Sequence, residues 1–168
     1  PKVLKEINER FKAHVSNSGK NTDPDLRGIL FTTTARKGGL REFNQMMRLY
    51  KDSQSNEEKL NLTAALCSFE QPELITKALK MITSSDVRIQ DVSYWIAYCF
   101  SNRFAREQAW KWLQEHWDWL VKHMGTDLSF YRMPVYVARN YSDASFISEY
   151  QKFFGAHLSS AFQRSYDQ

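Results

Sequence analysis

Hydrophobic side chains recur three and four positions apart along nearly the whole chain, which is the spacing of one face of an α-helix. In residues 1–15 the apolar positions of this stripe are Val3, Leu4, Ile7, Phe11 and Val15. The same spacing predicts helices over residues 24–37, 40–53, 55–69, 71–82, 86–102, 103–125, 127–141 and 143–157, and in the closing segment 158–168. Residues 29–35, ILFTTTA, favour a strand by local propensity alone. No series of short alternating runs occurs between Gly and Pro residues, so the pattern predicts an all-α fold.

Polar and turn-forming residues mark where these helices begin and end. Residues 16–22, SNSGKNT, interrupt the helical spacing and predict a loop between the first helix and the rest. Asp23 precedes Pro24, a pairing typical of a helix start. Ser55 and Glu58 have the spacing of a capping box, in which each side chain bonds the backbone N–H of the other residue. Pro134 lies inside the helix predicted for residues 127–141 and should kink it.

The predicted helices come in pairs joined by short connections. The pairs start near Asp23, Ser55, Asp86 and Asp127, which are about 30–40 residues apart. This repeat predicts an α-solenoid of the HEAT or armadillo type, built from stacked antiparallel helical hairpins. Residues 1–168 would then form a single domain.

Residues 109–125, AWKWLQEHWDWLVKHMG, hold four of the five tryptophans. On one helix, the first of two apolar faces would carry Trp110, Leu113, Trp117, Leu120 and Met124. The second face would carry Ala109, Trp112, His116, Trp119 and His123. A helix that is apolar on two faces is packed between neighbours, so the tryptophans are predicted to be structural. Two alternatives are base stacking, which the nearby acidic residues disfavour, and a metal site at the two histidines, which lack a third ligand in the sequence.

Composition and charge limit the classes of function. The net charge of +4 is spread along the chain without a block of Lys or Arg, so neither a nucleic acid nor a membrane surface is an expected partner. The longest apolar run, residues 94–100, is too short to cross a bilayer. Cys67 and Cys99 stand alone, which favours two buried free thiols in a reducing, cytoplasmic setting over a disulfide. The sequence holds no H-E-x-x-H, G-x-S-x-G or Walker motif, so we expect no self-contained active site.

Four segments nevertheless occur in a distinctive order. They are DPDLRGILFTTTARKGG, FNQMMRLYKDSQSNEEKLNLTAALCSFEQPELITKAL, VRIQDVSYWIAYCFSNRFAREQAWKWLQEHWDWLVKHMG and EYQKFFGAH, and together they span residues 23–157. This order resembles the C-terminal helical domain of the zinc aminopeptidase N family, the gluzincin aminopeptidases. The resemblance carries the same fold expectation, a bowl of HEAT-like helical hairpins.

The resemblance also implies a function. Enzymes of this family remove N-terminal residues from peptides, and a catalytic domain binds the zinc through H-E-x-x-H and a downstream Glu. The C-terminal domain is non-catalytic; it encloses the substrate chamber and limits access. The chain would then be the C-terminal portion of a larger aminopeptidase, with no zinc or other cofactor of its own and no hydrolysis when isolated. Its partners would be the catalytic domain of the same polypeptide and peptide substrates. The alternative is a free-standing HEAT-like scaffold that binds a protein or peptide in its concave groove.

In this family, basic side chains on the concave surface can receive the carboxylate of a peptide's C-terminus. The candidates for such a role are Arg88, Gln90, Asp91, Tyr94 and Tyr98. A helix over residues 86–102 would expose Val87, Asp91, Tyr94 and Tyr98 on one face. The opposite, core-facing stripe would be Ile89, Val92, Ile96 and Cys99. An arginine suits a carboxylate because its planar fork donates two parallel hydrogen bonds. The alternative is that Arg88 pairs with Asp91 across one helical turn.

Overall fold

The computed structural model describes every residue except 1, 17–21, 140, 142 and 158–168. The described residues form helices and their connections and contain no strand, which confirms the predicted all-α class. Residues 29–35 are helical despite their local strand propensity, because tertiary context outweighs a weak intrinsic preference. Most of the predicted loop 16–22 and all of the predicted closing helix 158–168 lie outside the described residues.

Ten α-helices and two short 3₁₀ helices make up the described part of the chain. The α-helices are α1 (Lys2–Ser16), α2 (Pro24–Lys37), α3 (Leu40–Asp52), α4 (Asn56–Leu66), α5 (Pro72–Met81), α6 (Val92–Ser101), α7 (Arg106–Glu115), α8 (Trp117–Met124), α9 (Met133–Ala138) and α10 (Ala144–His157). The 3₁₀ helices are η1 (Ile89–Asp91), which leads into α6, and η2 (Phe130–Arg132), which leads into α9. The α-helices after α1 lie within the predicted ranges, except that residues 103–125 hold two helices, α7 and α8.

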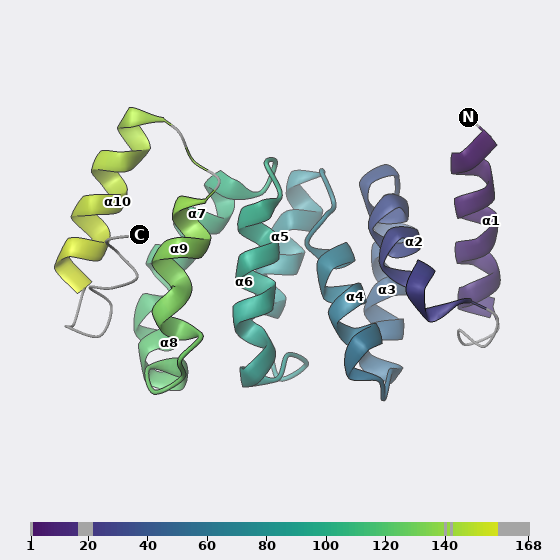
Figure 1. Ribbon diagram of the computed structural model, residues 1–168, viewed down its shortest axis with the longest axis horizontal. Coiled ribbons are helices and arrows are strands. Elements are labelled where there is room, and N and C mark those ends of the chain that lie inside the picture. Colours follow the sequence, from purple (N-terminus) through teal and green to yellow (C-terminus); the bar gives the residue numbers. More distant parts are fainter. Residues whose placement is uncertain (1, 17–21, 140, 142, 158–168) are drawn as a thin grey trace.

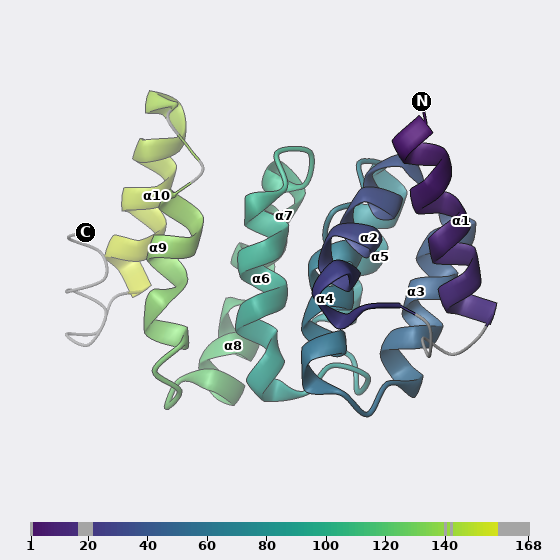
Figure 2. The same ribbon diagram turned by 45° about the vertical axis from the view of Figure 1, so that its right-hand side comes forward.

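The helices between α1 and α10 stand in two groups, one behind the other. Helices α2, α4, α6 and α9 form one row, and α3, α5, α7 and α8 lie behind it (Figure 1). Helix α1 packs against α2 at one end of the row, and α10 closes the other end (Figure 2). Among the described residues, no helix has both the length and the apolar character needed to span a membrane.

Helix α2 packs closely against α4, and Gly28 is placed at their contact. A Cβ atom at Gly28 would lie 3.0 Å from Oδ1 of Asn61, so a larger side chain here would require the Asn61 side chain to shift. The hydroxyl of Thr32, one turn further along α2, donates to the carbonyl of Gly28 at 2.7 Å.

The predicted capping box at α4 is only half formed. Ser55 caps the helix, since its Oγ accepts from the N–H of Glu58 at 3.3 Å. The backbone N–H of Ser55 instead donates to Oγ of Ser53 at 3.2 Å, and Ser53 Oγ donates to the Glu58 carboxylate at 2.6 Å. Glu58 is turned toward α1 and α2, where its other oxygen lies 3.4 Å from Arg27. A tertiary contact thus replaces the local cap.

The tryptophan-rich segment is two helices instead of one. His116, with φ −112° and ψ 14°, separates α7 from α8 although the segment has no Gly or Pro before Gly125. The predicted first face is nonetheless buried throughout: Trp110, Leu113, Trp117, Leu120 and Met124. On the second face, Ala109 and Trp112 are buried, whereas Trp119 is half-buried and His123 is exposed. The structural interpretation of the tryptophans is confirmed.

Two boundaries differ from the sequence prediction. The helix expected from residue 86 begins only at Ile89. The predicted face assignment is wrong at the start of this segment: Val87 and Asp91, predicted to be exposed, are buried, and Ile89, predicted to face the core, is 41% exposed. Pro134 does not kink a helix, because α9 begins at Met133 and a proline in the first turn needs no backbone donor. Cys67 and Cys99 are buried free thiols, as predicted.

Candidate binding pocket

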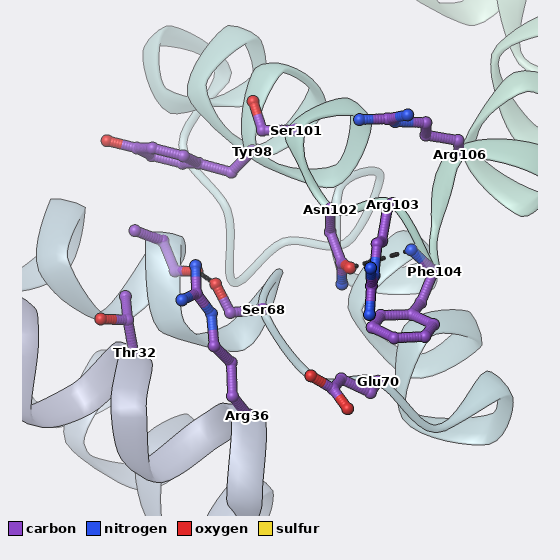
Figure 3. A pocket seen from close by; sticks show the side chains of 11 residues that line it. Thr32, Arg36, Ser68, Glu70, Tyr98, Ser101, Asn102, Arg103, Phe104 and Arg106 are labelled. Atoms are coloured by element: carbon purple, nitrogen blue, oxygen red, sulfur yellow. Dashed lines mark hydrogen bonds between the residues drawn. The ribbon is translucent and has the colours of Figure 1, made fainter. Parts of the chain in front are cut away.

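A pocket of about 560 Å³ opens where helices α2, α4 and α6 end (Figure 3). Its walls come from the last turns of these helices, from the α4–α5 and α6–α7 connections and from the first residue of α7. The charged residues that line it are Arg36, Glu70, Arg103 and Arg106. The volume lies within the range of roughly 300–1,000 Å³ typical of ligand sites.

Asn102 holds the two connections together. Its side-chain amide donates to the carbonyls of Cys67 at 2.9 Å and Phe69 at 2.7 Å, just past the end of α4. Its Oδ1 accepts from the backbone N–H of Phe104 at 3.1 Å. The Asn102 side chain therefore satisfies carbonyls that the end of α4 leaves without a partner, and it fixes the backbone on either side of Arg103 relative to Glu70.

The three arginines reach the pocket from different parts of the chain. Arg36 is exposed in the last turn of α2, and Arg103 is exposed with its guanidinium 4.6 Å from the centre of the Phe104 ring. Arg106 is half-buried; its Nε donates to the carbonyl of Phe100 at 3.3 Å, and its guanidinium lies 5.9 Å from the centre of the Tyr141 ring. Burial raises the pKa of Tyr141 to about 12, so its hydroxyl stays neutral beside this arginine at physiological pH.

The pocket carries an excess of positive charge. Within the described residues, none of its three arginines forms an ion pair with a carboxylate. The Glu70 carboxylate likewise forms no ion pair with a Lys, Arg or His of the described residues. Three guanidinium groups against one carboxylate in a concave site attract an anion, since concave walls concentrate the field of the charges that line them. The planar forks suit a carboxylate or phosphate group in particular.

Of the five residues that sequence analysis proposed, Tyr98 alone lines this pocket. Tyr98 is half-buried on α6, and burial raises the pKa of its hydroxyl, which therefore stays protonated and able to donate at neutral pH. Tyr94 lies one turn earlier on α6 and is 48% exposed. Arg88, Gln90 and Asp91 lie near the opposite end of the helix and do not reach the pocket.

The geometry at Arg88 matches the structural alternative. Its Nε donates to Oδ2 of Asp91 at 2.6 Å, and its Nη1 donates to Oδ1 of Asn56 at 2.8 Å. The hydrogen bond that the guanidinium donates to Asp91 raises the pKa of Arg88, and the Asp91 side chain is 9% exposed. Arg88 thus joins the start of α6 to the start of α4, with its fork already occupied.

Sequence reasoning missed Arg36, Glu70, Arg103 and Arg106, although the repeat held a signal for them. The connections that follow α2, α4 and α6 lie at the same end of the row, because all three helices end at the pocket. Arg36, Glu70 and Arg103 all lie next to such connections in three successive pairs. Charged residues at equivalent connections would therefore have been a better guide than one face of a single helix.

Two alternatives for the aromatic segment can be compared with the structure. Trp112 stacks on His116 and Trp119 stacks on His123, with ring centres 4.6 Å and 4.4 Å apart. Both histidines place Nδ1 within 2.9 Å of the carbonyl four residues earlier, so these nitrogens donate to the helix. Throughout the part of the chain that the structure describes, no three His, Cys, Asp or Glu side chains are grouped so that they could hold a metal ion.

The sequence of this chain is similar to parts of known proteins. Residues 1–168 match the family described as the ERAP1-like C-terminal domain, and the chain belongs to this family. Among similar proteins, mitochondrial aminopeptidase 2 of Saccharomyces cerevisiae is 28% identical over 97% of this chain and 17% of its own length. Aminopeptidase M1 of Arabidopsis thaliana is 26% identical over 99% of the chain and 19% of its own length. Aminopeptidase N of Lactococcus lactis is 25% identical over 88% of the chain and 18% of its own length.

These similarities confirm the resemblance to the C-terminal domain of aminopeptidases of the aminopeptidase N type. The chain spans less than a fifth of the length of these three relatives. Their names describe aminopeptidases as wholes, whereas the match covers one part of each.

Proposed function

We propose that this chain is the non-catalytic C-terminal domain of a zinc-dependent aminopeptidase, in which it encloses the substrate chamber and limits access for peptides. The observation that carries the proposal is the family match over residues 1–168, together with relatives that are named aminopeptidases. The zinc and the reaction would belong to the catalytic domain of the same polypeptide. A cytoplasmic location stays a prediction.

The arrangement of the helices supports a HEAT-like solenoid as the form of this domain. Four successive pairs, α2 with α3, α4 with α5, α6 with α7 and α8, and α9 with α10, begin at similar intervals. The first members of the pairs stand in one row, and the second members of the first three pairs lie behind it (Figure 1). Such a stack presents an extended surface built from equivalent positions of each repeat, which suits it to cover a chamber.

The pocket supplies the point at which this domain would meet a peptide. Its arginines would receive the C-terminal carboxylate, in place of the role that sequence analysis gave to Arg88. The pocket is open to solvent and holds three arginines that form no ion pair within the described residues, so a carboxylate can enter without displacing one. Charge-assisted hydrogen bonds to a guanidinium fork are among the stronger polar contacts in proteins.

The test compares one peptide of Gly, Ser and Ala ending in Leu as its free acid and as its C-terminal amide, titrated into the chain by calorimetry. The free acid should bind about tenfold more tightly, because hydrogen bonds to charged groups contribute about 1.5–3 kcal/mol before solvent exposure reduces them. The double variant Arg36→Ala with Arg103→Ala should abolish this difference. Arg48→Ala, which removes an exposed arginine of α3 outside the pocket, should preserve it. Equal binding of acid and amide to the unsubstituted chain would contradict the carboxylate site.

A further inference from the structure

The pocket also holds a set of groups that can only accept hydrogen bonds. Three of its side-chain hydroxyls donate their proton to a carbonyl of their own helix: Thr32 to Gly28 at 2.7 Å, Ser68 to Ala64 at 2.6 Å and Ser101 to Ala97 at 2.8 Å. A hydroxyl that has donated its proton offers a ligand lone pairs alone. These oxygens therefore match a ligand that donates, and they offer nothing to a second anion.

Glu70 adds a negative charge to the pocket. It is half-buried in the α4–α5 connection, and it lines the pocket without an ion pair to any of the three arginines within the described residues. The negative ends of the α4 and α6 dipoles also lie here, because both helices finish at the pocket. In Figure 3 the Glu70 carboxylate lies apart from Arg36 and Arg106, whereas Ser68 is drawn next to Arg36. The pocket therefore holds one negative group away from two of its three arginines.

A ligand that fits both parts carries an anion and a cation at a distance from each other. We infer that the pocket selects peptides whose C-terminal residue is Lys or Arg. The α-carboxylate binds the arginines, and the side-chain cation binds Glu70. The side chain of the ligand spans the gap between the two, which is why Glu70 and the arginines need not touch. This inference rests on the proposed function, since it assigns the selectivity of the same site.

The experiment adds three peptides to the titrations, identical except for the last residue, which is Lys, Leu or Glu, all as free acids. The unsubstituted chain should bind the Lys peptide roughly fivefold more tightly than the Leu peptide, the upper range for an ion pair that is partly open to solvent. Glu70→Gln should remove that advantage and leave the affinity for the Leu peptide unchanged. Glu73→Gln, a matched change at an exposed residue of α5 outside the pocket, should preserve the preference.

Reversal of the charge gives a second measurement that a general loss of fold cannot imitate. Glu70→Lys should turn the preference toward the Glu peptide while the free acid still binds better than the amide. Equal affinities for the Lys and Leu peptides, with the difference between acid and amide intact, would overturn the selectivity and leave the proposed function standing. Loss of the difference between acid and amide in the unsubstituted chain would remove both. Free lysine binding as tightly as the Lys peptide would show that the pocket recognises an amino acid and would overturn the assignment to peptides.

Discussion

The two ends of the helical row are held by different kinds of contact. At the α1 end, His14 is 1% exposed; its Nδ1 lies 2.9 Å from Oγ1 of Thr22, and its Nε2 lies 3.6 Å from the Glu58 carboxylate. Arg27 lies 3.4 Å from the same carboxylate oxygen. At the α10 end, aromatic rings from α7 and α8 pack against those of α10. Trp117 contacts Phe153 and Phe154 with ring centres 5.3 Å and 5.7 Å apart.

This difference predicts which changes, in pH or in side-chain volume, should destabilise each end. A buried polar cluster depends on the charge state of its members, because a lone charge in an apolar site is costly. An aromatic cluster depends on volume and shape, and pH changes neither. The pocket lies between the two ends, so each can be altered with the pocket residues left in place.

The largest effect is expected at the aromatic end. Trp117→Ala should lower the free energy of unfolding by about 3–5 kcal/mol, because it leaves a cavity beside Phe130 and the rings of α10. Denaturant unfolding followed by far-UV circular dichroism measures the change. Trp119→Ala, at a half-buried position two residues later, should cost about 1 kcal/mol. Equal losses in the two variants would show that the packing around Trp117 is not special.

A smaller loss is expected from the polar cluster. Glu58→Ala should cost about 2 kcal/mol, because Ser53 Oγ loses its acceptor and Arg27 loses a nearby carboxylate. The neighbouring change Glu57→Ala, at an exposed residue, should stay within about 0.5 kcal/mol. The same unfolding experiment compares the two. If both variants matched the unsubstituted chain, the cluster would contribute nothing to the attachment of α1.

The smallest effect is a dependence of stability on pH at the α1 end. Burial lowers the pKa of His14 below its usual 6.5, although the nearby Glu58 acts against this and Arg27 adds to it. The unfolded chain therefore takes up a proton at His14 more readily than the folded chain. Stability from this residue is complete above about pH 6.5 and is lost as the pH falls from there toward the folded pKa.

The measurement is the denaturant midpoint of unfolding at a series of pH values between neutral and mildly acidic. The slope due to His14 is at most about 1.4 kcal/mol for each pH unit, the limit for one proton. His14→Gln should flatten this part of the profile, whereas His123→Gln, at an exposed position, should leave it unchanged. A profile that His14→Gln does not alter would contradict the role of this histidine.

Much of the fold could be predicted because it depends on the spacing of apolar residues. Stripes such as that of Trp110, Leu113 and Trp117 are buried even where the helix breaks at His116. The break itself could not be predicted, since the segment has no Gly or Pro before Gly125 that would disfavour helix there. The predicted helix start at residue 86 was wrong because the helical spacing of apolar residues begins before the helix itself. The first hydrogen-bonded turn begins only at Ile89.

The candidate site was harder to predict because its parts are distant in sequence. Arg36, Glu70 and Arg103 become neighbours only after three helical pairs have stacked, and no local pattern connects them. Tyr98 was found because it lies on the solvent face of a recognisable helix. Arg88 was chosen for its chemistry, but a carboxylate of the same helix already occupies its fork.

The origin of the pocket walls in three successive pairs has a mechanical consequence. Arg36 is attached to α2 and Arg103 follows α6, with α4 between them. Any flexing of the row that alters the spacing of these helices also alters the separation of the two guanidinium groups. An anion that bridges both would resist the flexing, and by the reciprocity of linked equilibria a force that flexes the row would weaken its hold on the anion.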